Sequence, residues 1–324
     1  MNARVEPVLF DSRNNIRLFG ILHRPEDARE DVGIIILSPG IKSRVAPHRL
    51  YVKMAKRFCQ MGFCVLRFDP HGIGDSQGEI EERMVADFYG SVQVGRFVND
   101  TIDAMDWMAK EHGISRFILA GLCGGAITGL LTGASDRRVD SLLGLGIPVI
   151  LDNAVTDQGK YMTRGQLEVL RGSYLKKLLD IKSWSRFLML KSDYGLICRS
   201  IMTAMKSKIG NARKYSNESG NSTGSSTKTG HNFNPYFPMA LHKMLSSRRV
   251  LLVFSGADRL FWEFEEKYMT PYKNEYEKVK EIIEIYIVKD ANHVFSYKVW
   301  QGDMLNAAVT WLNMNYSRVN KGRS

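Results

Sequence analysis

The sequence contains no apolar run of the roughly 18 residues that a membrane-spanning helix needs. Its start also lacks the basic and then apolar layout of a secretory signal peptide, because the polar residues 1–5 are followed by Glu6 and Pro7. These two absences predict a protein of the cytoplasm. The hydrophobic share of 44% and the charged share of 24% are those of an ordinary globular chain, which excludes a fibrous or disordered one.

Cysteine is scarce, since the 324 residues include only four. None forms a CxxC pair or lies at zinc-ligand spacing from a histidine, so the sequence predicts neither a disulfide framework nor a metal site, and no cofactor is expected. Cys59, Cys64 and Cys198 lie within apolar patterns and are interpreted as core residues. Cys123 lies instead among glycines.

Asp and Glu residues are fewer than Lys and Arg residues, which gives the chain a formal net charge of +11. Most of the excess falls in residues 160–214, where 13 Lys and Arg residues accompany three acids. Such a surface attracts anionic substrates, anionic lipid headgroups or nucleic acid, although a solvated helix face gives the same pattern.

Short apolar runs alternate with segments of helical period along most of the chain. The predicted strands are residues 32–37, 63–68, 116–120, 142–145, 250–254 and 282–288, and the predicted helices are 49–60, 94–110, 124–132 and 303–316. Strands that are apolar on both faces and alternate with helices predict a mostly parallel sheet covered on both sides, an α/β fold. Residues 6–24 predict an antiparallel hairpin instead, with its turn near Asn14 and Asn15.

The alternation breaks between residues 152 and 247. This stretch contains two predicted helices, 167–179 and 188–208, followed by residues 215–230, whose Ser, Asn, Thr and Gly predict a flexible loop. We therefore predict a helical, basic lid at 152–247, inserted between two parts of one α/β core, 1–151 and 248–324.

The clearest chemical motif is Gly121-Leu122-Cys123-Gly124-Gly125, which follows a predicted strand and precedes a predicted helix. This is the spacing of a nucleophile elbow, a sharp turn that presents its central side chain at the edge of the sheet. A thiol at a helix N-terminus is favoured in its reactive thiolate form. Cys123 is therefore the predicted nucleophile, and a small buried core residue is the alternative.

A nucleophile of this kind requires an acid and a histidine later in the chain. Of seven histidines, only His293 lies between the last predicted strand and the last predicted helix, so it is the predicted general base. Asp258 follows the preceding strand and is the predicted acid. The nearby alternatives look like the exposed side of a following helix; they are Glu263, Glu265 and Glu266.

The oxyanion of a tetrahedral intermediate requires preorganised donors. One is expected from the backbone N–H of Gly124, directly after the nucleophile. The second is expected from Ile41, in the turn that follows the first long strand, because Pro39 has no N–H to donate.

These segments together resemble a known group. Residues 67–78 (RFDPHGIGDSQG), the elbow GLCGGA, GAD at 256–258 and NHVFS at 292–296 resemble serine-aminopeptidase-type α/β hydrolases, and more closely the exosortase-A-system-associated hydrolase branch, whose elbow also carries cysteine. The resemblance covers residues 16–150 and 248–315. It implies that Asp69 and Asp75 are structural, bracing a turn beneath the site. The sequence departs from the group at Pro39-Gly40, where related hydrolases have His-Gly.

Three functions remain open from sequence. The first is hydrolysis of esters or thioesters through an acyl-enzyme, and the second is transfer of the acyl group from Cys123 to an alcohol or amine. Polyhydroxyalkanoate synthases also use a G-x-C-x-G-G elbow, and this family is a distant alternative within the second function, acyl transfer. The third is a non-catalytic binding protein whose lid docks on an anionic surface. We expect a small acyl substrate, including anionic ones, peripheral contact of the lid with anionic membrane, and no nucleic-acid partner.

Overall fold

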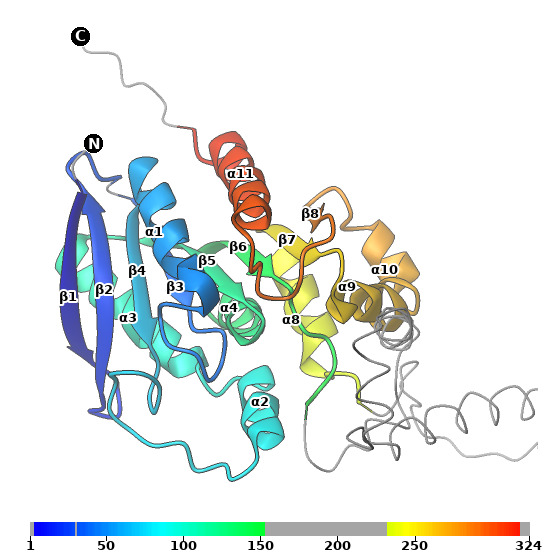
Figure 1. Cartoon of the computed structure of the whole chain (residues 1–324), viewed down its shortest axis with the longest axis horizontal. Helices are drawn as coiled ribbons and strands as arrows, with labels where there is room; N and C mark the ends of the chain where they lie inside the picture. Colours follow the sequence, from blue (N-terminus) through cyan, green and yellow to red (C-terminus); the bar gives the residue numbers. More distant parts are fainter. Residues whose placement is uncertain (1–2, 30, 153–231, 318–324) are drawn as a thin grey trace, which may run out of the picture. The chain divides into compact units, whose positions relative to one another are not determined.

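The computed structural model describes residues 3–29, 31–152 and 232–317, which all belong to one compact unit (Figure 1). Its centre is an eight-stranded sheet of order β1-β2-β4-β3-β5-β6-β7-β8. The strands are β1 (Ala3–Asp11), β2 (Arg17–Pro25), β3 (Val32–Leu37), β4 (Cys64–Asp69), β5 (Arg116–Leu122), β6 (Val139–Leu145), β7 (Arg249–Ser255) and β8 (Ile283–Val288). All six strands predicted after the hairpin are present.

The sheet is parallel from β4 to β8. The pairs β1–β2 and β2–β4 are antiparallel, so the predicted hairpin is confirmed, with Asn15 in its turn at a φ of 55°. Strand β3 is buried along its whole length, which explains why its sequence is apolar at every position. A mostly parallel α/β sheet is therefore confirmed.

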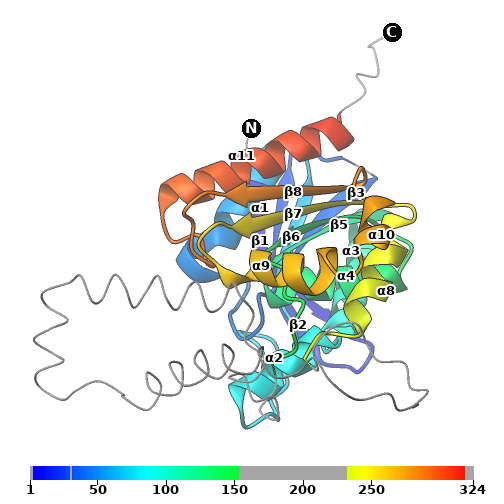
Figure 2. The same ribbon diagram turned by 90° about the vertical axis from the view of Figure 1, so that its right-hand side faces the viewer.

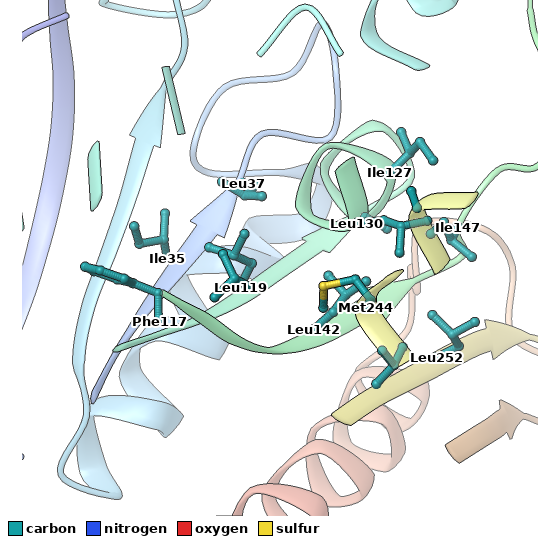
Figure 3. Close-up of a cluster of buried hydrophobic side chains, with 14 of the residues drawn as sticks. Ile35, Leu37, Phe117, Leu119, Ile127, Leu130, Leu142, Ile147, Met244 and Leu252 are labelled. Carbon is teal, nitrogen blue, oxygen red and sulfur yellow. The ribbon is translucent and has the colours of Figure 1, made fainter. Parts of the chain in front are cut away.

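Helices cover both faces of the sheet (Figures 1 and 2). The ranges are α1 (Leu50–Gln60) and α11 (Lys298–Asn315) on one face, and α3 (Val98–His112), α4 (Gly124–Ser135) and α8 (Tyr236–Leu245) on the other. Alternate residues of β3 enter different cores: Ile35 packs in the α3–α4–α8 core (Figure 3), whereas Ile34 and Ile36 pack beneath α1 and α11.

Two further short helical segments lie near the carboxyl ends of the strands. Helix α2 (Val85–Gln93) falls between β4 and α3 and was not predicted, and α9 (Arg259–Phe264) follows β7. A π-helical turn (Glu265–Met269) and α10 (Lys273–Glu277) continue from α9, and a 3-10 turn (Pro47–Arg49) precedes α1.

The predicted lid falls mostly outside the described residues, including both of its predicted helices and residues 215–230. Its described end, 232–247, packs on the core through α8, whose Phe237 and Leu241 are fully buried. In the described parts of the chain, no helix has the length and apolar character that crossing a bilayer requires.

Candidate active site

Cys123 occupies a strained turn between β5 and α4. Its φ of 53° and ψ of −112° are backbone angles that residues with a side chain rarely adopt, and such strain costs about 1–3 kcal/mol. Two glycines permit the turn. A Cβ at Gly121 would lie 2.5 Å from the carbonyl carbon of Gly125, and a Cβ at Gly125 would lie 2.3 Å from the carbonyl oxygen of Leu37. The elbow predicted from sequence is therefore formed.

Two hydrogen bonds fix the elbow to its surroundings. The Cys123 N–H donates to the Leu145 carbonyl of β6 at 2.8 Å, and the Leu122 N–H donates to the hydroxyl of Tyr51 at 2.7 Å. Tyr51 is fully buried on α1, and burial raises the pKa of its hydroxyl far above its usual range. Tyr51 thus holds the elbow from beneath as a neutral phenol, a role that no sequence motif marks.

Replacing Tyr51 with phenylalanine should lower the free energy of unfolding by about 1–3 kcal/mol, because the Leu122 N–H would remain buried without its acceptor. Urea or guanidinium denaturation measures this change. Tyr286→Phe is the matched control, since its hydroxyl bonds Asp303 at an exposed position and its loss should cost about 0.5 kcal/mol or less. Equal stabilities of Tyr51→Phe and the wild type would contradict the assigned role.

His293 and Asp258 lie together at the carboxyl ends of β8 and β7. The Nδ1 atom of His293 is 2.7 Å from Oδ2 of Asp258, and the other carboxylate oxygen, Oδ1, accepts the Arg259 N–H at 2.8 Å. Both oxygens of Asp258 are therefore engaged, which fixes the orientation of the imidazole. Because Nδ1 faces Asp258, the second ring nitrogen, Nε2, is the one available to Cys123, whose interaction with the ring helps to raise the pKa of His293.

The structure corrects the prediction for one of the alternative acids. Glu263 is fully buried rather than on an exposed helix side, because its carboxylate pairs with Arg259 one helical turn earlier, at 2.5 Å. Burial raises the pKa of Glu263 to about 7 against the opposing effect of Arg259. Glu263 supports Arg259, which in turn donates its N–H to Asp258, so Glu263 acts on the site through Arg259.

The environment of His293 favours its charged form. Burial lowers the pKa of the imidazole, but the hydrogen bonds to Asp258 and Cys123 and the charges of both groups outweigh burial and raise it to about 10. An imidazolium at this position places a positive charge beside Cys123, which also lies at the N-terminus of α4. A cationic neighbour and a helix N-terminus are typical surroundings of reactive cysteines in proteins.

NMR titration of the histidine rings should therefore place His293 near pH 10. Because this value is above the ordinary 6.5, the proton stabilises the folded state fully below pH 6.5, and this stabilisation is lost as the pH rises through about 10. In Cys123→Ala the midpoint should fall towards 6.5, since two of the raising interactions are removed. The other histidines serve as internal controls, and an unchanged His293 midpoint in the variant would contradict the pairing.

The two predicted oxyanion donors lie on adjacent segments. Gly124 is the first residue of α4, where N–H groups have no acceptor within the helix. A Cβ at Gly124 would lie 3.0 Å from the Pro39 carbonyl oxygen, so the turn after β3 borders the elbow. The Ser38 hydroxyl lies 2.9 Å from the Gly40 carbonyl oxygen and shapes this turn. Ile41 has an exposed side chain, and the ring of Tyr89 packs on the preceding residue, since a Cβ at Gly40 would lie 2.6 Å from its Cε1 atom.

Asp69 stands beneath this turn, as the resemblance implies. Its carboxylate accepts the N–H groups of Arg44 at 2.6 Å and Asp75 at 3.1 Å, and it also pairs with the Arg44 guanidinium. Arg44 bridges to the exposed Asp75 at 2.6 Å. Asp69 and Asp75 thus connect the turn after β3 to the turn after β4.

A cavity of about 410 Å³ lies elsewhere, lined by residues that include Asp136, Arg137, Val139 and Lys243. Val139 begins β6, whereas the elbow bonds Leu145 at the other end of that strand. This cavity is therefore at the opposite edge of the sheet from Cys123. In the described residues no cluster of His, Cys, Asp and Glu could hold a metal ion.

No protein-family model matches the sequence, and no curated protein is similar to it. Solved structures are similar, however. An esterase of Pyrococcus furiosus matches 96% of this chain and 93% of its own, with a TM-score of 0.55 and 15% identity. A dienelactone hydrolase of Anabaena variabilis matches 98% of this chain and 99% of its own, with a TM-score of 0.56 and 13% identity. An α/β hydrolase of Penicillium sp. matches 96% of this chain and 98% of its own, with a TM-score of 0.51 and 18% identity.

The chain has the α/β-hydrolase fold. Identities this low establish the fold alone, and function must be argued from the site. The resemblance to the exosortase-associated branch and the use of cysteine as nucleophile stay predictions. The structure brings Cys123, His293 and Asp258 together and adds three residues that sequence reasoning missed: Ser38, Tyr51 and Tyr89.

Proposed function

We propose that the chain is a hydrolase of carboxylic esters or thioesters that acts through an acyl group carried on Cys123. The observation that supports this most strongly is that His293 hydrogen-bonds Asp258 at 2.7 Å and interacts with Cys123, which lies in a strained elbow. A buried structural cysteine would require neither the strain nor the partnered histidine. The esterase and the dienelactone hydrolase among the similar structures agree with this reaction class.

In the first half-reaction the Cys123 thiolate attacks the acyl carbonyl carbon and forms a C–S bond. The carbonyl oxygen becomes an oxyanion beside the N–H of Gly124. When the tetrahedral intermediate collapses, the bond from the acyl carbon to the leaving oxygen or sulfur breaks. The leaving group takes the proton from Nε2 of the His293 imidazolium, and a thioester remains on Cys123.

In the second half-reaction neutral His293 acts as the general base. It removes a proton from water, whose oxygen attacks the thioester carbonyl, and the C–S bond then breaks. The acid is released, Cys123 leaves as thiolate and the proton stays on His293, so the starting ion pair is restored. Asp258 keeps its two hydrogen bonds throughout and stabilises the charged ring.

Acyl transfer is the second candidate, and the presence of cysteine favours it. A thioester on Cys123 is close in free energy to a thioester donor, so an alcohol or amine could replace water in the second half-reaction. The basic segment 160–214, expected to attract anionic substrates or anionic membrane, lies outside the described residues and stays a prediction.

Turnover of nitrophenyl esters and acyl-thioesters of varied chain length, with and without an alcohol or amine acceptor, distinguishes the two reactions. Release of free acid in water alone is expected for a hydrolase. Turnover that requires the acceptor would replace hydrolysis with transfer. If no substrate in the panel turned over under either condition, the proposal of an acyl-group enzyme would lose its support.

A further inference from the structure

Strand β8 lies at one end of the sheet. Among the described residues it pairs only with β7, and Figure 2 is viewed from the side on which it lies. The Val288 carbonyl oxygen accepts the N–H of Gly256, directly after β7, at 2.8 Å. Because successive residues of a strand direct their N–H and C=O groups to opposite sides, those of Ile285 and Ile287 point away from β7, to the open edge.

This edge is apolar and carries no protection against pairing. The side chain of Ile287 is 43% exposed and that of Ile285 is half-buried. The strand at the other end of the sheet, β1, has Pro7 at its middle and exposed Arg4 near its start, both of which discourage pairing with another chain. Strand β8 has no proline, so its backbone groups can accept a further strand.

A second copy of this chain fits the open edge. When two identical strands pair antiparallel about a two-fold axis with Ile285 on the axis, Ile285 lies opposite its own copy and Ile283 lies opposite Ile287. The isoleucines then form a continuous stripe of cross-strand pairs on one face of the joined sheet. The same register places Glu281 opposite Lys289 at both ends of the stripe, and both side chains are exposed. Opposite charges therefore border an apolar centre.

The neighbouring registers lack this match. An axis at Tyr286 places Lys289 opposite Ile283, and an axis at Ile287 places Glu284 opposite Asp290, two like charges. The backbone also favours the axis at Ile285, because two copies of a residue with outward N–H and C=O groups exchange two hydrogen bonds.

We propose that two copies of this chain join through their β8 edges, antiparallel about a two-fold axis at Ile285, and form one continuous sheet. The carboxyl ends of antiparallel strands point in opposite directions. The two candidate active sites, which lie at the carboxyl ends of the strands, therefore open on opposite sides of the dimer. Formation of this dimer does not depend on the chemistry of Cys123.

Sedimentation velocity of the purified full chain, from low to high micromolar concentration, should show a dimer that dissociates on dilution. Glu281→Lys places like charges at both ends of the stripe and should raise the dissociation constant about tenfold, as should Lys289→Glu. The double variant restores opposite charges, so its dissociation constant should return near that of the wild type. Glu26→Lys is the matched control, since it reverses an exposed charge after β2, far along the sheet from β8.

Circular dichroism verifies that each variant is folded. Recovery of the dimer in the double variant would support the register, because a substitution that merely damaged the strand would not be repaired by a second one. A wild type that stays monomeric at every concentration would overturn the inference. So would a dimer that neither single reversal weakens, or a double variant as dissociated as the single ones.

Discussion

Cys123→Ala is expected to lose at least about 10⁴-fold in kcat on any ester or thioester that the wild type hydrolyses. Alanine removes the atom that forms the acyl bond and leaves only the binding surface and the oxyanion donors. The turn itself should persist, because alanine has the same Cβ as cysteine and the glycines on either side still permit the close approach. The measurement is steady-state turnover of the purified variant.

Cys59→Ala is the matched control, since Cys59 is a buried thiol on α1 that lies in the core. Its replacement should change stability but leave kcat near the wild-type value. Cys123→Ser adds a second comparison: its hydroxyl is held in the same elbow but is a poorer nucleophile beside a histidine that is already charged, so activity between wild type and alanine is expected. Wild-type activity in Cys123→Ala would rule out the cysteine mechanism.

Asp258→Asn should lower kcat by about 10⁴-fold while the protein remains folded. The reason lies in the two occupied carboxylate oxygens. Oδ1 accepts the Arg259 N–H, so the amide oxygen of asparagine would remain there and its NH₂ would face Nδ1 of His293. Nδ1 would then have to accept a hydrogen bond, which places the ring proton on Nε2 and prevents that atom from taking a proton from water.

Glu263→Gln provides the comparison, because Glu263 is a buried acid on the same short helix but bonds Arg259 rather than His293. Its loss of activity should be much smaller, with the main cost in stability. The test is kcat against pH for both variants, together with circular dichroism to verify folding. Equal losses of activity in the two variants would contradict the assignment of Asp258 as the acid that orients His293.

The core strands were predictable because their burial leaves a direct mark on the sequence. Strand β3 was predicted at its observed bounds, since every residue from Val32 to Leu37 is buried and apolar. The elbow was equally visible, because the close approach to Leu37 excludes any side chain at Gly125. Such constraints act on neighbouring residues, and a sequence records them locally.

Helix α2 was not predicted, and with it Tyr89 was missed. The segment is short and follows a polar, charged stretch, so the helical spacing of its apolar residues is too brief to indicate a helix; they are Val85, Phe88, Tyr89 and Val92. The contact of Tyr89 with Gly40 joins two segments that are far apart in sequence, so no local pattern reveals it. Glu263 was misjudged for a related reason, since a glutamate four residues after an arginine is typical of an exposed ion pair, and only the tertiary structure shows that it is buried.

Intact-mass analysis of the protein quenched during turnover tests the central claim most directly. With a slowly hydrolysed acyl-thioester, the account predicts one added acyl mass on the wild type, located by peptide mapping to Cys123, sensitive to hydroxylamine, and absent from Cys123→Ala. An adduct on Cys59, Cys64 or another residue that persisted in Cys123→Ala, or turnover without any covalent adduct at Cys123, would contradict the account.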